Sequence, residues 1–543
     1  MWYSKSNEFQ YSTLSMKKSI LIGLLILGIT LLLASIFGPD FLEGKLKTAL
    51  EAQVVIQTDS SYTMEFQELD ISLWGRRVTA DSISISPKND RETIKSIQIH
   101  SFEIQEIKWL SLITEDFPQF GKVVVEQPEI EIYSRPFTSS TFSNNSGAIT
   151  DTSSNSINFS SFDLNIIDGK ARMVEPSGRT EVMLEHFDLS ATKVNVNQIL
   201  DGSRVPFLDE LILSGKNLTW RLDEKLYRLE VGAFSFDRVQ KQALVQNIAL
   251  IPVLPRYRFS EIKGYSSDRV ELNIDKINLQ GVNLDSLYIP RIEVEKISIE
   301  QGALAMFKNK TIPSKTTIGF RPLLSEAISK ATVAQVGLHE VLINNFDVTY
   351  TEHKEGVKEP GEVTFKDISG SISNISTPGY PTFLTDSLEL DVSTYFMGVS
   401  KLDLKARYAL FDKDEYHRVW GSLGSIHTSA LKSPLINLAS IEAKSGQVNS
   451  LEFHFNVNRT AANGQILLDY QDLNIFLLKD HDTSQKPLAS RVSSFIANTF
   501  IIDDSNTGSK LEPAKIHYKW DNRKGVFGYW WQALLSGIKA TIK

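Results

Sequence analysis

The chain has no cysteine among its 543 residues. Disulfides, thiolate metal sites and cysteine nucleophiles are therefore excluded together. Clustered positive charge is also missing, and the formal net charge is −8. Because phosphate binding needs a clustered basic face, we expect no nucleic-acid partner. The lack of cysteine is compatible with an oxidising periplasm.

Sequence motifs for catalysis and metal binding are absent as well. The nine histidines are scattered, with no pair at metal-ligand spacing on one helix face. Glycine–lysine pairs occur, but none is followed by the Ser or Thr of a phosphate loop, and no Gly-x-Ser-x-Gly elbow is present. We expect no enzyme activity, metal or cofactor, although acid–base pairs assembled across strands leave no sequence signature.

Only one long apolar run occurs, SILIGLLILGITLLLASIF at residues 19–37. It is uncharged and about as long as a helix needs to cross a bilayer. Lys17 and Lys18 precede it, so the positive-inside rule places residues 1–18 in the cytoplasm. A cleaved signal peptide is the alternative, but the apolar core is unusually long for one. The sequence therefore predicts a single transmembrane signal-anchor with an exported body.

After the anchor, DFLEGKLKTALEAQ at residues 40–53 has leucines at helical spacing, and the period then changes to two. Alternation of this kind predicts strands with one dry and one wet face. The strongest apolar sets are Val270, Leu272 and Ile274; Ile292 and Val294; Leu388, Leu390 and Val392; and Leu402 and Leu404.

Turn-forming residues interrupt these runs, for example at Asp168-Gly169, Ser214-Gly215, Gln301-Gly302 and Asn344-Asn345. A degenerate unit recurs around them, and it predicts stacked antiparallel hairpins. Few helices are expected, at residues 323–333, 488–500 and the C-terminal tail.

Composition divides the exported part. Residues 138–161 are rich in Ser, Thr and Asn, which predicts a linker. We therefore expect an N-terminal helix with a β unit at 38–137, two stretches of sheet at 162–335 and 336–522, and a C-terminal amphipathic helix at 523–543.

The C-terminal helix carries an apolar stripe beside lysines. The stripe includes Phe527, Trp530, Trp531, Leu534, Leu535 and Ile538. Trp and Tyr beside Lys are typical of a membrane interface, whereas a helix that caps the last strands would show the same stripe. The sequence leaves these two interpretations open.

A long sheet that is apolar on one side must cover that side. Sheets pair face to face as a sandwich, or one sheet curls into a trough that holds an apolar occupant. Periodicity does not distinguish the two. At about 4.8 Å per strand, roughly 25 to 30 strands would form a trough on the order of 130 Å long.

Several segments in order resemble AsmA-family envelope proteins, in particular the medium-length members from Bacteroidetes. They are DFLEGKLKTALEAQ, MEFQELDISLW, GKVVVEQPEIEIY, SDRVELNIDKINLQGVNL, VEKISIEQGALAMF, LHEVLINNFDVTYTEH, GEVTFKDISGSISNIS, NGQILLDYQDLNIFLL and RKGVFGYWWQALLSGIKATIK. The resemblance is one of pattern and order across most of the exported chain. It implies a long curved antiparallel β-groove and a role in outer-membrane homeostasis and phospholipid movement.

The strand pattern and the apolar run predict a mostly β protein held in a membrane by one N-terminal helix, and the resemblance implies that it is a groove protein of a bacterial inner membrane with its bulk in the periplasm. The expected partner is a phospholipid or other lipid, whose acyl chains would contact the apolar strand sets named above. A trough of that length would fall short of crossing an envelope, so the chain either meets another envelope protein at its distal end or acts more locally. The alternative function is a structural scaffold in envelope or outer-membrane protein assembly, with a filled core and no lipid path.

Overall fold

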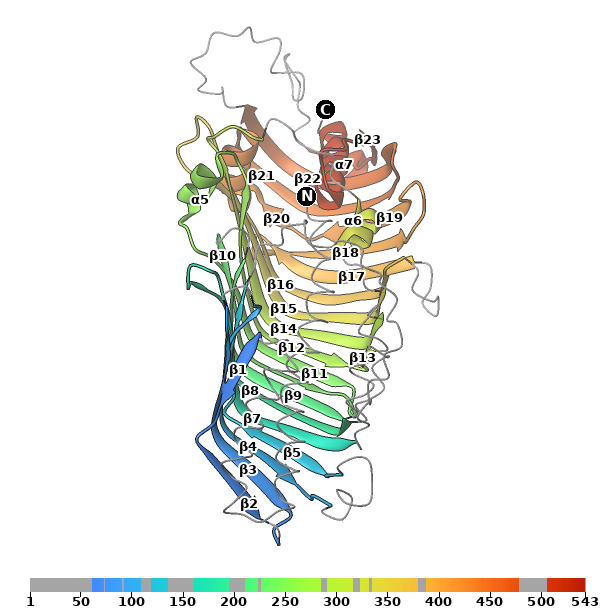
Figure 1. Cartoon of the computed structure of the whole chain (residues 1–543). Helices are drawn as coiled ribbons and strands as arrows, with labels where there is room; N and C mark the ends of the chain where they lie inside the picture. The colour runs from blue at the N-terminus through green and yellow to red at the C-terminus, as the bar shows by residue number, and fades with distance from the viewer. Residues whose placement is uncertain are drawn as a thin grey trace. The chain divides into compact units, whose positions relative to one another are not determined.

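The chain is mostly β, with a large antiparallel sheet and few helices, as the computed structural model shows (Figure 1). This part of the predicted fold class is confirmed. The predicted anchor, Lys17, Lys18 and the expected helices at 40–53 and 488–500 lie outside the described residues. Those described are 61–72, 74–89, 92–108, 119–134, 161–194, 210–222, 226–284, 291–315, 323–331, 335–378, 387–477 and 505–542. Within these ranges, no helix has the length and hydropathy to span a membrane.

The chain forms two compact units. The first comprises residues 1–221, 229–246 and 282–290, and the second comprises 222–228, 247–281 and 291–543. The boundary that we predict at residue 335 lies within the second unit, in the first residues of a strand. Most of the predicted linker at 138–161 lies outside the described residues.

The first unit is built from strands that pair mainly with their sequence neighbours. They are β1 (Tyr62–Glu65), β2 (Glu68–Ser72), β3 (Arg77–Pro87), β4 (Ile94–Gln105), β5 (Lys122–Glu126), β6 (Glu129–Tyr133), β7 (Phe162–Val174), β8 (Thr180–Val194) and β9 (Leu211–Leu222), with most of β10 (Tyr227–Asp237), part of β11 (Gln242–Pro252) and the short β13 (Asn283–Leu284). β1 and β2 both pair with β3, and β5 and β6 both pair antiparallel with β4 and parallel with β7.

A residue with a left-handed backbone inside β3 shows how a strand can bend and still keep all of its apolar side chains on one buried face. Ser82 has φ 54°, and Val78 and Ala80 before it pack in the same buried cluster as Ile83 and Ile85 after it. Strict alternation would place the two pairs on opposite faces. The bend shifts the alternation by one residue, so both pairs face the same core.

The second unit continues with the longest strands of the chain. They are β12 (Asp268–Gln280), β14 (Arg291–Lys310), β15 (Gln335–Lys354), β16 (Gly361–Ser376), β17 (Ser387–Phe396), β18 (Ser400–Ala409), β19 (His417–Leu423), β20 (Ile426–His427), β21 (Ile441–Val457), β22 (Ala461–Leu477) and β23 (Ala514–Lys519). β14 and β15 pair parallel, and the other pairings recorded in this unit are antiparallel.

The predicted hairpin turns at the four Gly and Asn pairs are wrong, because all four positions lie inside long strands. Asp168 in β7, Gln301 in β14 and Asn345 in β15 have φ between 52° and 57°, as Ser82 does. Ser214-Gly215 lies within β9, where Asn217 has φ 57°. Asn, Asp and Gly tolerate a left-handed backbone in turns and in strand bends alike, so the sequence signal is the same for both.

Short helices complete the second unit. α6 (Leu324–Ala331) and α7 (Val526–Thr541) lie within the predicted ranges 323–333 and 523–543, and these two predictions are confirmed. α5 (Arg256–Lys263) was not predicted. It lies between Pro255 and a left-handed C-cap at Gly264, and it buries only Phe259 and Ser260. A helix with so small a buried face leaves little periodicity to detect.

Candidate functional site

A row of apolar side chains runs across five neighbouring strands of the second unit without becoming buried. Cross-strand pairing aligns Leu272 in β12, Leu304 in β14, Val348 in β15, Phe365 in β16 and Phe396 in β17. All five side chains are half-buried by the described residues. Four spacings of about 4.8 Å make this row about 19 Å long. We call it the open row.

A second row starts half-buried and ends fully buried. It links Leu279, Ile297, Val341, Ile372, Leu390, Ala406, Val419 and Phe455 through β12, β14 to β19 and β21. Leu279 and Ile297 are half-buried, whereas Ala406, Val419 and Phe455 are at most 3% exposed. Those last three belong to one cluster with Tyr529, Trp530 and Ala533 of α7. The C-terminal helix therefore contributes to the cover of this end of the apolar face, with contacts on β22 and β23 and with Trp530 against His417 of β19.

The first unit has comparable half-buried apolar pairs on its central strands. Ala171 and Leu184 align with Leu218 across β7, β8 and β9, and all three are half-buried. Its fully buried cluster lies mainly over β1 to β5. Each unit, taken separately, thus combines a filled core with a stretch of incompletely covered apolar face.

The structure divides the predicted lipid-facing residues between covered and open parts of the sheet. Val270, Leu272, Ile292 and Val392 are half-buried, and Ile274 and Val294 are buried at 8% and 2% exposure. Leu388 packs in a buried cluster with Tyr408 and Leu410, against Leu324 and Ile328 of α6. Leu390, Leu402 and Leu404 pack against the cluster under α7.

The aromatic residues of the C-terminal helix separate onto two faces. Trp530 is 7% exposed and Tyr529 is fully buried, whereas Phe527 and Trp531 are 71% and 52% exposed. Leu534 and Ile538 pack against the buried cluster, and Leu535 is half-buried. The inward residues cap β22 and β23, as one of the two sequence interpretations expects. Phe527 and Trp531 remain mostly exposed, although the Phe527 ring meets the Trp530 ring edge-on with centroids 5.4 Å apart.

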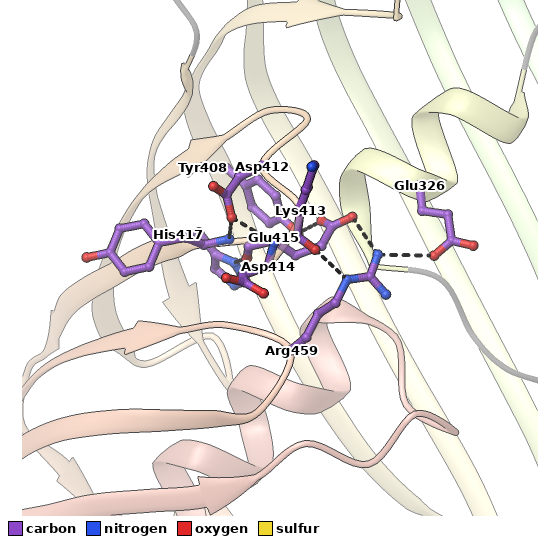
Figure 2. A network of polar contacts seen from close by, with 9 residues as sticks. Glu326, Tyr408, Asp412, Lys413, Asp414, Glu415, His417 and Arg459 are labelled. Atoms are coloured by element: carbon purple, nitrogen blue, oxygen red, sulfur yellow. Dashed lines mark hydrogen bonds and ion pairs between the residues drawn. The ribbon is translucent and has the colours of Figure 1, made fainter.

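A buried polar network holds this capped end together (Figure 2). The imidazole of His417 stacks on the Tyr408 ring, with centroids 4.2 Å apart. Its Nε2 accepts a hydrogen bond from Trp530 Nε1 at 2.8 Å, and its Nδ1 lies 2.7 Å from the Glu415 carbonyl oxygen. An indole N–H only donates and a carbonyl only accepts, so His417 is neutral with its proton on Nδ1. Burial lowers the pKa of His417 to about 4.

The carboxylate of Glu415 is buried and shares a cation with a second acid. Tyr408 donates its hydroxyl to Glu415, and Arg459 Nη2 lies 3.5 Å from both Glu415 and Glu326 of α6 (Figure 2). Burial, and then the bond to Glu415, raises the pKa of the Tyr408 hydroxyl. Arg459 also donates from Nε to the Lys413 carbonyl at 3.1 Å. The network thus ties α6 and α7 to the β18–β19 and β21–β22 connections.

The hydrogen bonds and ion pairs of the network join the polar groups of His417, Tyr408, Glu415 and Arg459 to one another or to the backbone, which stabilises this end of the unit. Among the described residues, no three His, Asp or Glu side chains are grouped to hold a metal ion. The half-buried apolar face keeps part of its surface accessible to solvent.

Sequence reasoning missed the network and most of the open row. The network joins residues from four separate segments, with Trp530 and His417 113 positions apart, so it has no local spacing. Leu304, Val348 and Phe365 do lie in strands with alternating patterns, but their alignment with Leu272 depends on strand register. No family model matches the chain, and no curated protein is similar to it.

Proposed function

We propose that this protein binds lipid acyl chains on its apolar sheet face, as a membrane-anchored periplasmic β-groove protein that supports the outer membrane. The open row is the observation that carries the proposal. The half-buried side chains of this row keep part of their apolar surface in water, and an apolar occupant would remove that surface from water. The row's length of about 19 Å exceeds the roughly 15 Å that one leaflet's hydrocarbon occupies.

The energetics favour such an occupant. Each methylene group that leaves water contributes roughly 0.8 kcal/mol, so an acyl chain on this face would gain several kcal/mol even when only half covered. The covered end of the second unit sets a limit to the site. α6 packs against the cluster that contains Leu388 of β17, and α7 packs on β22 and β23, which restricts acyl contacts in this unit mainly to β12, β14 to β16 and the Phe396 end of β17.

The anchor at 19–37, the periplasmic location and the role in envelope homeostasis rest on the sequence and on the resemblance to AsmA-like proteins. The competing function is a scaffold for envelope assembly. The fully covered clusters at β1 to β5 and β18 to β23 are the observation in its favour, because a scaffold needs only filled cores.

Photo-cross-linking in living cells separates the two. A photoreactive amino acid replaces Leu272 in the open row, and its neighbour Asn273, which is exposed on the same strand, serves as the matched control. We expect a lipid adduct by mass spectrometry at position 272 and none at 273. A folded protein without a lipid adduct at position 272 would favour the scaffold.

Charge substitution provides a second comparison within the same sheet. Leu272→Asp should leave the fold intact and deplete bound lipid, because this side chain borders the open face. Leu390→Asp should destabilise the protein by about 3 kcal/mol, because Leu390 packs against the cluster under α7. Equal destabilisation by both substitutions would indicate a filled core at both places.

A further inference from the structure

The outward face of α7 carries a stripe of apolar side chains, of which Phe527 also meets the Trp530 ring edge-on with centroids 5.4 Å apart. Phe527 and Trp531 are spaced four residues apart and are both more than half exposed. Leu535 follows at the same spacing and is half-buried. Residues at this spacing lie on one side of a helix, opposite the buried Tyr529, Ala533 and Gly537. We call Phe527, Trp531 and Leu535 the outer stripe.

Basic side chains lie at both ends of the outer stripe. Lys524 lies just before the helix, which begins at Val526, and Lys539 follows Leu535 by four residues on the same side of the helix. Residues 505–542 contain six Lys and Arg but only two Asp and Glu, in a chain whose formal net charge is −8. Within residues 505–542, the acidic residue closest in sequence to the helix start is Asp521, which is paired with Arg523 and also interacts electrostatically with Lys524.

We propose that the outer stripe docks α7 flat onto a bilayer that contains anionic phospholipid. Large aromatic rings between basic ends suit the interface, where the rings lie at headgroup level and lysines meet lipid phosphates. Capping and docking use different residues of one helix. The polar network holds the inward face of α7 in place through Trp530 and His417, so that the helix presents Phe527 and Trp531 without unfolding.

The cysteine-free chain allows a direct test with one fluorescent probe. Gly528 lies on the exposed side, and a Cβ there would meet only Lys524 Cβ at 3.6 Å, so Gly528→Cys keeps both aromatic residues of the stripe. The full chain, labelled at this cysteine and reconstituted in phosphatidylcholine nanodiscs, is mixed with vesicles that carry a quencher on their lipids. The matched control probe is Val399→Cys, which is 59% exposed and belongs to the same unit.

We expect quenching at position 528 by vesicles with phosphatidylglycerol, less with phosphatidylcholine alone, and none at position 399. Added salt should weaken the quenching, because the lysine contacts are screened. Replacing Phe527 and Trp531 by Ser should lower vesicle binding by roughly tenfold or more, since two interfacial rings are lost. The fold should persist, because both residues are exposed.

The inference is overturned if anionic vesicles leave the probe at 528 unquenched, or if the double-serine variant binds them as well as the parent chain does. The first result would indicate a protein partner for the outer stripe. Neither result bears on acyl chains at the open row, which the cross-link at position 272 reports independently.

Discussion

The buried imidazole of His417 should make the C-terminal cap of the second unit sensitive to mild acid. In the folded protein its pKa is about 4, because burial disfavours the charged ring, whereas an exposed histidine has a pKa near 6.5. Between these two values the unfolded chain binds the extra proton and the folded chain does not. Stability from this group is therefore complete above pH 6.5 and is lost as the pH falls toward 4.

The size of the effect follows from the separation of the two pKa values. Each pKa unit corresponds to 1.36 kcal/mol, so the full effect is about 3 kcal/mol, of which about 2 kcal/mol is lost between pH 7.5 and pH 5. His417 is 0% exposed, and hence solvent screening does not reduce this figure. Protonated Nε2 could no longer accept from Trp530, which removes the bond that holds α7 to β19.

Hydrogen exchange of the α7 amides, corrected for the intrinsic effect of pH, measures this loss directly. The matched control is His417→Gln, since the amide offers one donor toward the Glu415 carbonyl and one acceptor toward Trp530 but does not titrate. We expect protection of α7 in the parent protein to fall by about 2 kcal/mol over this pH range and to fall much less in the glutamine variant. If the protection of the α7 amides fell equally with pH in the two proteins, the assignment of the pH effect to His417 would be refuted.

Two further substitution pairs test the cap and the strand bends. Arg459→Met removes the cation that pairs with the buried Glu415 and should lower the free energy of unfolding, measured by chemical denaturation, by about 2 kcal/mol. This figure is below that of a fully buried pair because the Arg459 side chain is one-third exposed and solvent screens its charge. Arg407→Met removes the exposed pair with Glu389 and should cost less than about 1 kcal/mol, so equal losses would contradict the role of burial. Gly302→Ala would place a Cβ 2.4 Å from the Phe346 ring and should lower stability by about 1–2 kcal/mol in thermal unfolding. Gly528→Ala meets no atom closer than 3.6 Å and should be neutral or stabilise α7 by up to about 1 kcal/mol, and a loss there would show that the exposed face of α7 is not free.

Strand content and the two confirmed helices were predictable because each depends on residues close together in sequence. Alternation around Leu272 or Leu402 reports the two faces of one strand. The stripe in α7 likewise reports one helix. The bends at Asp168, Gln301 and Asn345 were mistaken for turns, because a left-handed residue carries the same sequence signal in both settings.

By itself, then, the sequence determined that the chain is mostly β with one-sided strands and a C-terminal amphipathic helix. Only the tertiary structure decided what covers each side. It showed that Leu390 packs against the cluster that includes residues of α7 while Leu272 belongs to the half-buried open row, and that Trp530 faces inward while its neighbour Trp531 faces outward. The reason is physical: periodicity reports whether a face is apolar, whereas its covering depends on strand register and on contacts between segments as distant as His417 and Trp530.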